Sequence, residues 1–229
     1  LKKSRPVLFQ ALLLFLGIAV FVRLASRHLP PFAPLSPDIL AAFLFLYTPF
    51  FHYRRGRSPS WLKVGDAGKS ALVCIALAAG GTLAYLAYTR LPLPPFLVPN
   101  TGSAPPLAEL IFREGLLVAL PEEVFFRGYL YDAFEEKGWE PVVPSSVLFA
   151  AGHLLIFASW YRALTFFPGL LLGWSRKSTG NIYAPVLLHL LDNAISPVLL
   201  RALAQHYPGV PWYGFARISG DLEDGDFCR

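Results

Sequence analysis

The segment from Leu116 to Asp132, which reads LLVALPEEVFFRGYLYD, constrains this chain more than any other part of the sequence. It places two adjacent carboxylates, Glu122 and Glu123, and the guanidinium of Arg127 inside a run of Leu, Val, Phe and Tyr. Ionisable side chains are costly in such a run and mark a functional site by default. On a helix, Glu123 and Arg127 are four residues apart and can pair, whereas Glu122 points about 100° away. The sequence therefore predicts Glu122 as the reactive group.

Two further apolar segments carry polar side chains. In the sequence FAAGH, Phe149 is followed four residues later by His153, and Gly152 beside it removes side-chain bulk. In the sequence HLLDN, His189 is followed four residues later by Asn193. Side chains four residues apart emerge from the same face of a helix. We therefore expect three separate apolar helices to bring their polar groups into one site.

The three motifs, E-E-x-x-x-R, F-x-x-x-H and H-x-x-x-N, resemble those of the CAAX protease and bacteriocin-processing family of glutamate-dependent intramembrane endopeptidases. All motif residues are present, in the family's order, and each motif lies on its own apolar segment. The resemblance covers residues 107–203 and implies an intramembrane endopeptidase. Family members include type II CAAX prenyl endopeptidases, and related bacterial enzymes such as myxosortases remove C-terminal sorting helices.

The composition indicates an integral membrane protein. Of 229 residues, 55% are hydrophobic and 15% are charged, and the mean hydropathy is +0.48, which is too apolar for an ordinary soluble domain. The cations fall mainly between the apolar runs, where they set topology, so we exclude a nucleic-acid partner. The expected partners are the lipid bilayer and a membrane-anchored protein or peptide substrate. The Arg-, Pro- and Ala-rich composition is typical of a GC-rich bacterial genome, and we expect a multi-pass protein of the bacterial inner membrane.

The predicted fold is an all-α bundle of about seven transmembrane helices with the active site in its interior. The expected spans are residues 7–25, 39–53, 70–88, 107–135, 142–160, 163–174 and 182–203. They divide into N-terminal helices and a Pro-rich loop (1–106), a catalytic core (107–203) and a polar tail (204–229). The positive-inside rule places the N-terminus and the Arg-rich loop at 54–63 in the cytoplasm, and alternating crossings place the tail outside.

Prolines and polar residues predict local breaks in these helices. Pro121 should kink the fourth helix and free the carbonyl of Leu117. The pair Pro168-Gly169 is expected to break the sixth span, and residues 175–180 to form a polar cytoplasmic turn. Arg113 and Glu114, about two turns before the motif, are interpreted as interfacial residues.

Peptide hydrolysis needs an activated nucleophile, stabilisation of an oxyanion and a proton for the leaving amine. Glu122 can supply the general base, and His153 can orient the same water and pass on the proton. His189 and Asn193 suit an oxyanion site because both side chains donate hydrogen bonds without carrying charge. The resemblance implies the same division of roles. Arg127 would keep Glu123 ionised and outside the chemistry.

A metal-dependent reading uses the same residues. Glu122, His153 and His189 form a His₂Glu set like that of open zinc sites, and Asp192 could support one of the histidines. We favour direct glutamate catalysis without a cofactor because the sequence lacks an H-E-x-x-H pair. Both versions predict loss of activity in Glu122→Ala.

Other functions remain as alternatives. Some relatives are assigned as non-proteolytic membrane scaffolds or bacteriocin self-immunity proteins, and a Glu/His set could also relay protons in a transporter. The intact polar motifs favour a protease. Ser175, in the fragment Gly-Trp-Ser, resembles part of a rhomboid serine protease site, but a three-residue fragment beside Arg176 and Lys177 is weak evidence for a nucleophile.

Overall fold

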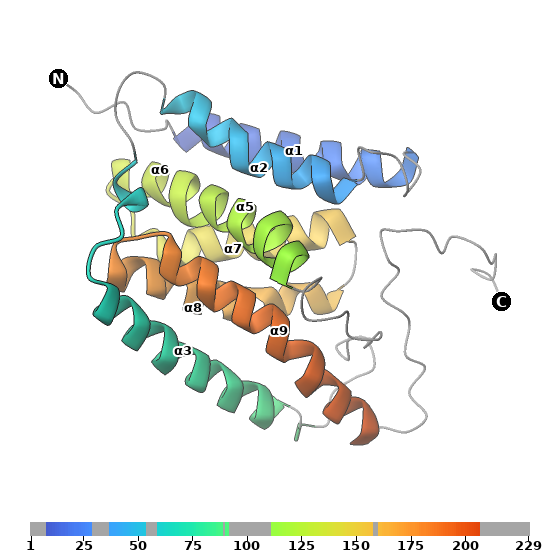
Figure 1. Cartoon of the computed structure of the whole chain (residues 1–229). Coiled ribbons are helices and arrows are strands. Elements are labelled where there is room, and N and C mark those ends of the chain that lie inside the picture. Colours follow the sequence, from blue (N-terminus) through green and yellow to red (C-terminus); the bar gives the residue numbers. More distant parts are fainter. Residues whose placement is uncertain are drawn as a thin grey trace.

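The computed structural model describes residues 8–28, 37–53, 59–88, 90–91, 111–157 and 160–206. In this part of the chain all regular elements are helices, and seven are long, so the predicted all-α bundle is confirmed (Figure 1). The helices outside the Glu-Glu segment are α1 (Leu8–His28), α2 (Pro37–His52), α3 (Ala67–Tyr88), α7 (Val142–Phe157), α8 (Phe166–Thr179) and α9 (Tyr183–His206), with short 3₁₀ turns η1 (Ser60–Leu62) and η5 (Trp160–Thr165).

The Glu-Glu segment forms one continuous helix of mixed geometry, which we call the motif helix. It consists of η3 (Arg113–Ala119), α5 (Leu120–Glu123), η4 (Val124–Leu130) and α6 (Tyr131–Glu136), and both η3 and η4 are π-helical. Such wider turns are rare and frequently occur at functional sites. The predicted disturbance around Pro121 is therefore present, but it takes the form of π-helical turns on both sides of a short α-helical step.

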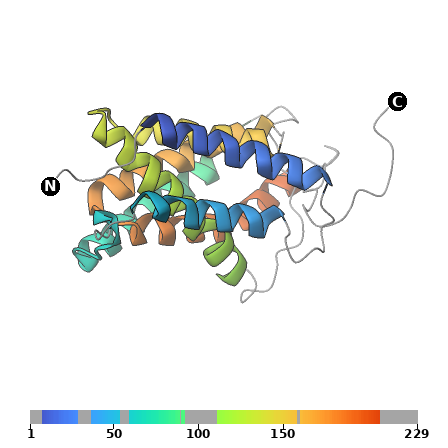
Figure 2. The same cartoon turned by 90° about the horizontal axis from the view of Figure 1, so that it is seen from above.

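The motif helix lies at the centre of the bundle. Helices α1 and α2 pack against each other and against the motif helix on one side, and α7 also contacts α1. Helices α8 and α9 lie on the other side, with α3 packed against both (Figures 1 and 2). The core between α1, α2, the motif helix and α7 is rich in aromatic rings. Phe126 contacts Phe149 with a centroid distance of 5.2 Å, and Phe125 contacts Phe45 at 4.8 Å.

The loops at one end of the bundle contact one another. The backbone N–H of Ile182 donates to the carbonyl of Trp61 at 3.0 Å, and Asn181 Nδ2 donates to the carbonyl of Val64 at 2.8 Å. Lys177 pairs with Glu140 at 3.1 Å at the same end. The connections at 59–66, 137–141 and 180–182 thus share one end, as alternating helix directions require (Figure 1). Most of the Arg-rich loop, the Pro-rich loop and the tail lie outside the described residues.

Two described helices are long and apolar enough to cross a membrane, Leu8–His28 and Ala67–Tyr88. The segments Ile39–Phe51 and Val142–Ile156 are also apolar but shorter. On α3, large side chains such as Leu72, Ile75 and Leu83 are exposed, as expected for a lipid-facing helix. The number of membrane crossings remains a prediction.

The predicted break in the sixth span is wrong. Helix α8 continues from Phe166 to Thr179 because Pro168 falls in its first turn, where backbone N–H groups need no intrahelical acceptor. Most of the predicted polar turn is the last part of this helix, which ends at Gly180 with a positive φ of 74°. Ser175 and Arg176 are consequently buried rather than exposed at a helix end.

Candidate active site

Arg127 and Glu123 form the predicted ion pair in the centre of the bundle. Nη1 of Arg127 lies 3.1 Å from Oε1 of Glu123, and both side chains have no exposed surface. Nη2 donates to the carbonyl of Gly169 at 2.9 Å, and the guanidinium carbon lies 4.3 Å from the centroid of the Phe149 ring. A Cβ at Gly169 would lie 3.3 Å from Nη2, so the absence of a side chain there allows α8 to approach the arginine. These contacts fix the guanidinium in one position.

Arg176 supports this arrangement from α8. Its Nε donates to the backbone carbonyl of Arg127 at 3.1 Å, within the π-helical segment. Its guanidinium also pairs with Asp132 at 3.6 Å, and the hydroxyl of Tyr53 donates to the same carboxylate at 2.9 Å. A buried charge needs both a partner and hydrogen bonds, and these contacts supply them for Arg176. No sequence pattern indicated this role, since Arg176 was expected in a polar turn.

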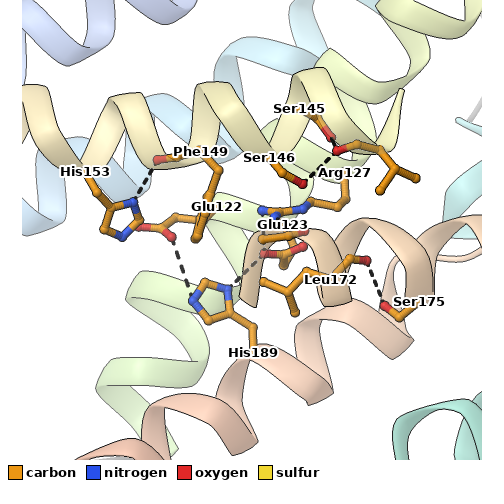
Figure 3. A network of polar contacts seen from close by, with 12 residues as sticks. Glu122, Glu123, Arg127, Ser145, Ser146, Phe149, His153, Leu172, Ser175 and His189 are labelled. Carbon is orange, nitrogen blue, oxygen red and sulfur yellow. Dashed lines mark hydrogen bonds and ion pairs between the residues drawn. The ribbon is translucent and has the colours of Figure 1, made fainter. Parts of the chain in front are cut away.

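His189 on α9 joins the two carboxylates of the motif helix. Its Nδ1 lies 2.9 Å from Oε1 of Glu123, and its Nε2 lies 3.9 Å from Oε2 of Glu122 (Figure 3). Glu123 therefore does more than bind Arg127, because it also orients the imidazole. These distances place both motif-helix carboxylates beside His189, and support of a histidine by Asp192 stays a prediction.

His153 on α7 is held in one tautomer by its own helix. Its Nδ1 lies 3.0 Å from the carbonyl oxygen of Phe149. A carbonyl only accepts, so Nδ1 carries the hydrogen and Nε2 keeps a lone pair in the neutral ring. The Phe149 ring contacts the His153 ring at 4.5 Å and the His189 ring at 5.8 Å between centroids. One phenyl ring thus brings the imidazoles of two helices together, with Glu122 beside them (Figure 3).

Glu122 differs from its neighbour in the way expected for a reactive group. Its side chain is 17% exposed, whereas that of Glu123 is completely buried. Oε2 of each glutamate has no hydrogen-bond partner among the described residues. A buried carboxylate oxygen without such a partner is rare in folded proteins and calls for an explanation such as a catalytic role. Of the two glutamates, Glu122 has the exposed surface that a substrate or water needs to reach it.

Asn193 lies one turn beyond His189 and contacts the motif helix. Its Nδ2 donates to Oε2 of Glu114 at 3.1 Å, and both side chains are partly buried. Glu114, which the sequence suggested as an interfacial residue, thus contacts a motif residue of α9. Ordinary α-helical periodicity could not place Glu114 near the site, because it lies in the π-helical segment η3, where the wider turn changes which residues share a face.

Asp192 belongs to a different environment from the other polar residues. It forms part of the wall of a small cavity of about 30 Å³ between α3, α8 and α9, large enough for about one water molecule. It also shares a hydrogen bond with Tyr85 of α3. Asp192 thus connects α9 to α3.

The geometry also bears on the metal and serine alternatives. Among the described residues, no three His, Cys, Asp or Glu side chains are arranged to hold a metal ion. Ser175 is completely buried, and its hydroxyl donates to the carbonyl of Leu172 at 2.9 Å. Such a local bond within α8 is common for serine in helices.

Residues 101–195 match the family model of the type II CAAX prenyl endopeptidase Rce1-like proteins. This part of the chain is therefore similar to the CAAX protease family. The matched region contains all three motifs, and the family is one of membrane-integral CAAX-type endopeptidases. Comparisons with curated proteins and with solved structures gave no match. The matched segment thus contains Glu122, His153 and His189, which the bundle brings close together.

Proposed function

We propose that this chain is an intramembrane endopeptidase that cleaves a peptide bond near the C-terminus of a membrane-anchored protein, with Glu122 as the general base. The observation that carries the proposal is the convergence of Glu122, His153 and His189 from three helices. The rings of His153 and His189 both contact the Phe149 ring, and Nε2 of His189 lies 3.9 Å from Oε2 of Glu122. The similarity of residues 101–195 to the type II CAAX prenyl endopeptidase Rce1-like proteins supports the same activity.

The charges of Glu122, Glu123, Arg127 and His189 suggest how Glu122 can be ionised when the reaction begins. Glu122 and Glu123 carry two negative charges when ionised, and Arg127 carries one positive charge. A net charge in an apolar interior is costly. One additional proton on either Glu122 or His189 makes the group neutral, and Nε2 of His189 lies 3.9 Å from Oε2 of Glu122. We therefore infer that one of these two side chains carries the proton, and that it can pass to the other when their atoms approach within hydrogen-bonding distance.

Hydrolysis then needs two proton transfers, the attack of water on the carbonyl carbon and the cleavage of the carbon–nitrogen bond. With the shared proton on His189, ionised Glu122 removes a proton from a water molecule, whose oxygen attacks the carbonyl carbon of the scissile bond. The carbonyl becomes a tetrahedral oxyanion. The carbon–nitrogen bond breaks, and the proton taken from water passes to the leaving amine. Nε2 of His153 can accept a hydrogen bond from the attacking water, since its Nδ1 donates to the Phe149 carbonyl.

The oxyanion requires donors that are fixed before the reaction. Asn193 supplies an amide N–H, and protonated His189 supplies Nε2–H. Glu123 holds Nδ1 of His189 at 2.9 Å and thereby fixes the direction of Nε2. His189 and Asn193 lie on one face of α9, as an oxyanion site built on a single rigid helix requires.

The substrate is proposed from the family. A CAAX prenyl endopeptidase acts on a membrane-embedded, prenylated protein. The Arg-, Pro- and Ala-rich composition, which is typical of a GC-rich bacterial genome, favours a related cleavage reaction. In that reaction a C-terminal sorting segment is removed from a membrane-anchored protein. In both cases the scissile bond lies near the C-terminus and close to a membrane anchor.

The proposal is tested with C-terminally tagged, membrane-anchored substrates co-expressed with wild type, Glu122→Gln or Ser175→Ala. Gln keeps the shape of Glu122 and removes the base, so we expect a rate loss of roughly 10²- to 10⁴-fold. Ser175→Ala is the matched control and should cleave like wild type. Equal cleavage by wild type and Glu122→Gln would refute the role of Glu122, and loss of cleavage in Ser175→Ala would favour a serine mechanism.

A further inference from the structure

One carboxylate outside the three motifs reaches the site. Oε2 of Glu114 accepts a hydrogen bond from Nδ2 of Asn193 at 3.1 Å, between η3 and α9. We infer that Glu114 is a positioning residue that fixes the side-chain amide of Asn193 for oxyanion stabilisation. This inference rests on the proposed endopeptidase function, because it assigns a task to Glu114 within that reaction.

The chemistry of the two groups makes the contact directional. An asparagine amide has an accepting oxygen and a donating nitrogen at opposite sides, and rotation by 180° exchanges them. An ionised carboxylate only accepts, so Glu114 requires Nδ2 to face it. Once that orientation is fixed, the second N–H of the same nitrogen has a defined direction and is available as a donor. Without Glu114, the amide can turn and present its oxygen, which repels an oxyanion.

The backbone around Glu114 holds the contact in place. Glu114 lies in the π-helical segment η3, which packs directly against α9. A Cβ at the neighbouring Gly115 would be in van der Waals contact with Leu190, at 3.8 Å from its Cδ1. Both carboxylate and amide are partly buried, so the hydrogen bond is only partly shielded from water. A preorganised donor needs such support from neighbouring residues.

The test is a double-mutant cycle on the cleavage rate. Asn193→Ala should lower kcat by about 10²- to 10³-fold, as loss of one oxyanion donor does. Glu114→Ala should lower kcat by roughly tenfold with KM unchanged, because an interaction used in the transition state is weakened. The double variant should be no slower than Asn193→Ala alone. Glu114→Gln, which has the same shape and can turn its own amide, should fall between wild type and Glu114→Ala. Glu135→Ala, exposed at the far end of the motif helix, is the control and should match wild type.

A second readout does not depend on activity. The chain has three asparagines, Asn100, Asn181 and Asn193, so ¹⁵N-asparagine labelling gives few side-chain amide signals, and Asn193→Ala assigns the relevant one. Glu114→Ala should shift that signal and speed its hydrogen exchange. An unmoved signal overturns the inference, as do a Glu114→Ala variant faster than wild type and a double variant slower than Asn193→Ala. A moved signal in a protein that cleaves no substrate would instead overturn the proposed function and leave the contact established.

Discussion

Nδ1 of His189 lies 2.9 Å from Oε1 of Glu123, the same oxygen that Nη1 of Arg127 approaches at 3.1 Å. The second carboxylate of the Glu-Glu pair is therefore the link between the arginine of the motif helix and the histidine of α9. Oε2 of Glu122 lies 3.9 Å from Nε2 of the same imidazole, and the Glu122 side chain is 17% exposed whereas that of Glu123 is completely buried. Adjacent glutamates thus have different environments, and their substitutions should have different effects.

Glu123→Gln should slow cleavage without abolishing it. The glutamine oxygen can still accept a hydrogen bond, but the charge that favours one orientation of His189 is lost. Hydrogen bonds to charged groups contribute about 1.5–3 kcal/mol, so we expect a rate loss of roughly 10- to 100-fold in single-turnover cleavage. Glu122→Gln measured alongside should be much slower. If Glu123→Gln cleaved more slowly than Glu122→Gln, Glu123 rather than Glu122 would be the general base.

Arg127→Ala should destabilise the protein strongly. It leaves the completely buried Glu123 without its guanidinium partner, and breaking one side of a buried ion pair costs about 3–5 kcal/mol. Lys177→Ala is the control, because it removes an ion pair with Glu140 whose side chains are 55% and 50% exposed and which contributes at most about 1 kcal/mol. Thermal unfolding in detergent measures both variants. Similar unfolding temperatures for the two would show that the buried pair adds no stability.

Gly169→Ala should reduce both stability and activity. The new methyl group would lie 3.3 Å from Nη2 of Arg127, 3.3 Å from Cβ of Ser146 and 3.4 Å from Cδ1 of Phe149, so these groups must move. Overpacking of this kind costs about 1–3 kcal/mol. At Gly17 on α1, by contrast, a Cβ would meet nothing within 4 Å. Gly17→Ala should stabilise the helix by about 0.5–1 kcal/mol, and an equal loss in both variants would contradict the packing argument.

Chelation should leave cleavage unchanged if Glu122 acts directly on water. The measurement is the rate after prolonged dialysis against a strong zinc chelator, followed by addition of zinc. A catalytic zinc would be held by Glu122, His153 and His189 and would activate the water in place of the general base. Activity that disappears on dialysis and returns with zinc would establish the metal mechanism.

The sequence predicted the helices and the ion pair well because both depend on local spacing. The helix α1 begins and ends within a few residues of the expected span, and the pairing of Glu123 with Arg127 follows from a separation of four residues. The three motifs also predicted which helices carry the polar groups. The family match over residues 101–195 agrees with that prediction.

Contacts between helices could not be predicted in the same way. The hydrogen bond between Glu114 and Asn193 joins residues 79 positions apart in the sequence. It depends on a π-helical turn that no residue pattern predicted. The hydrogen bond between Asp192 and Tyr85 of α3 likewise joins residues far apart in the sequence. The polar residues at 175–180 suggested a turn, whereas burial of Arg176 against Asp132 allows the helix to continue.

The sequence by itself determined the all-α class, the location of the polar motifs on separate apolar helices and the pairing within the motif helix. These properties follow from hydropathy and from the fixed period of a helix. Only the tertiary structure decided which carboxylate contacts His189 and which residue hydrogen-bonds Asn193. It also decided that Arg127 packs against the backbone of Gly169, where a side chain would be too close. The physical reason is that these contacts depend on helix register and on the width of individual turns, which are set by packing of the whole bundle.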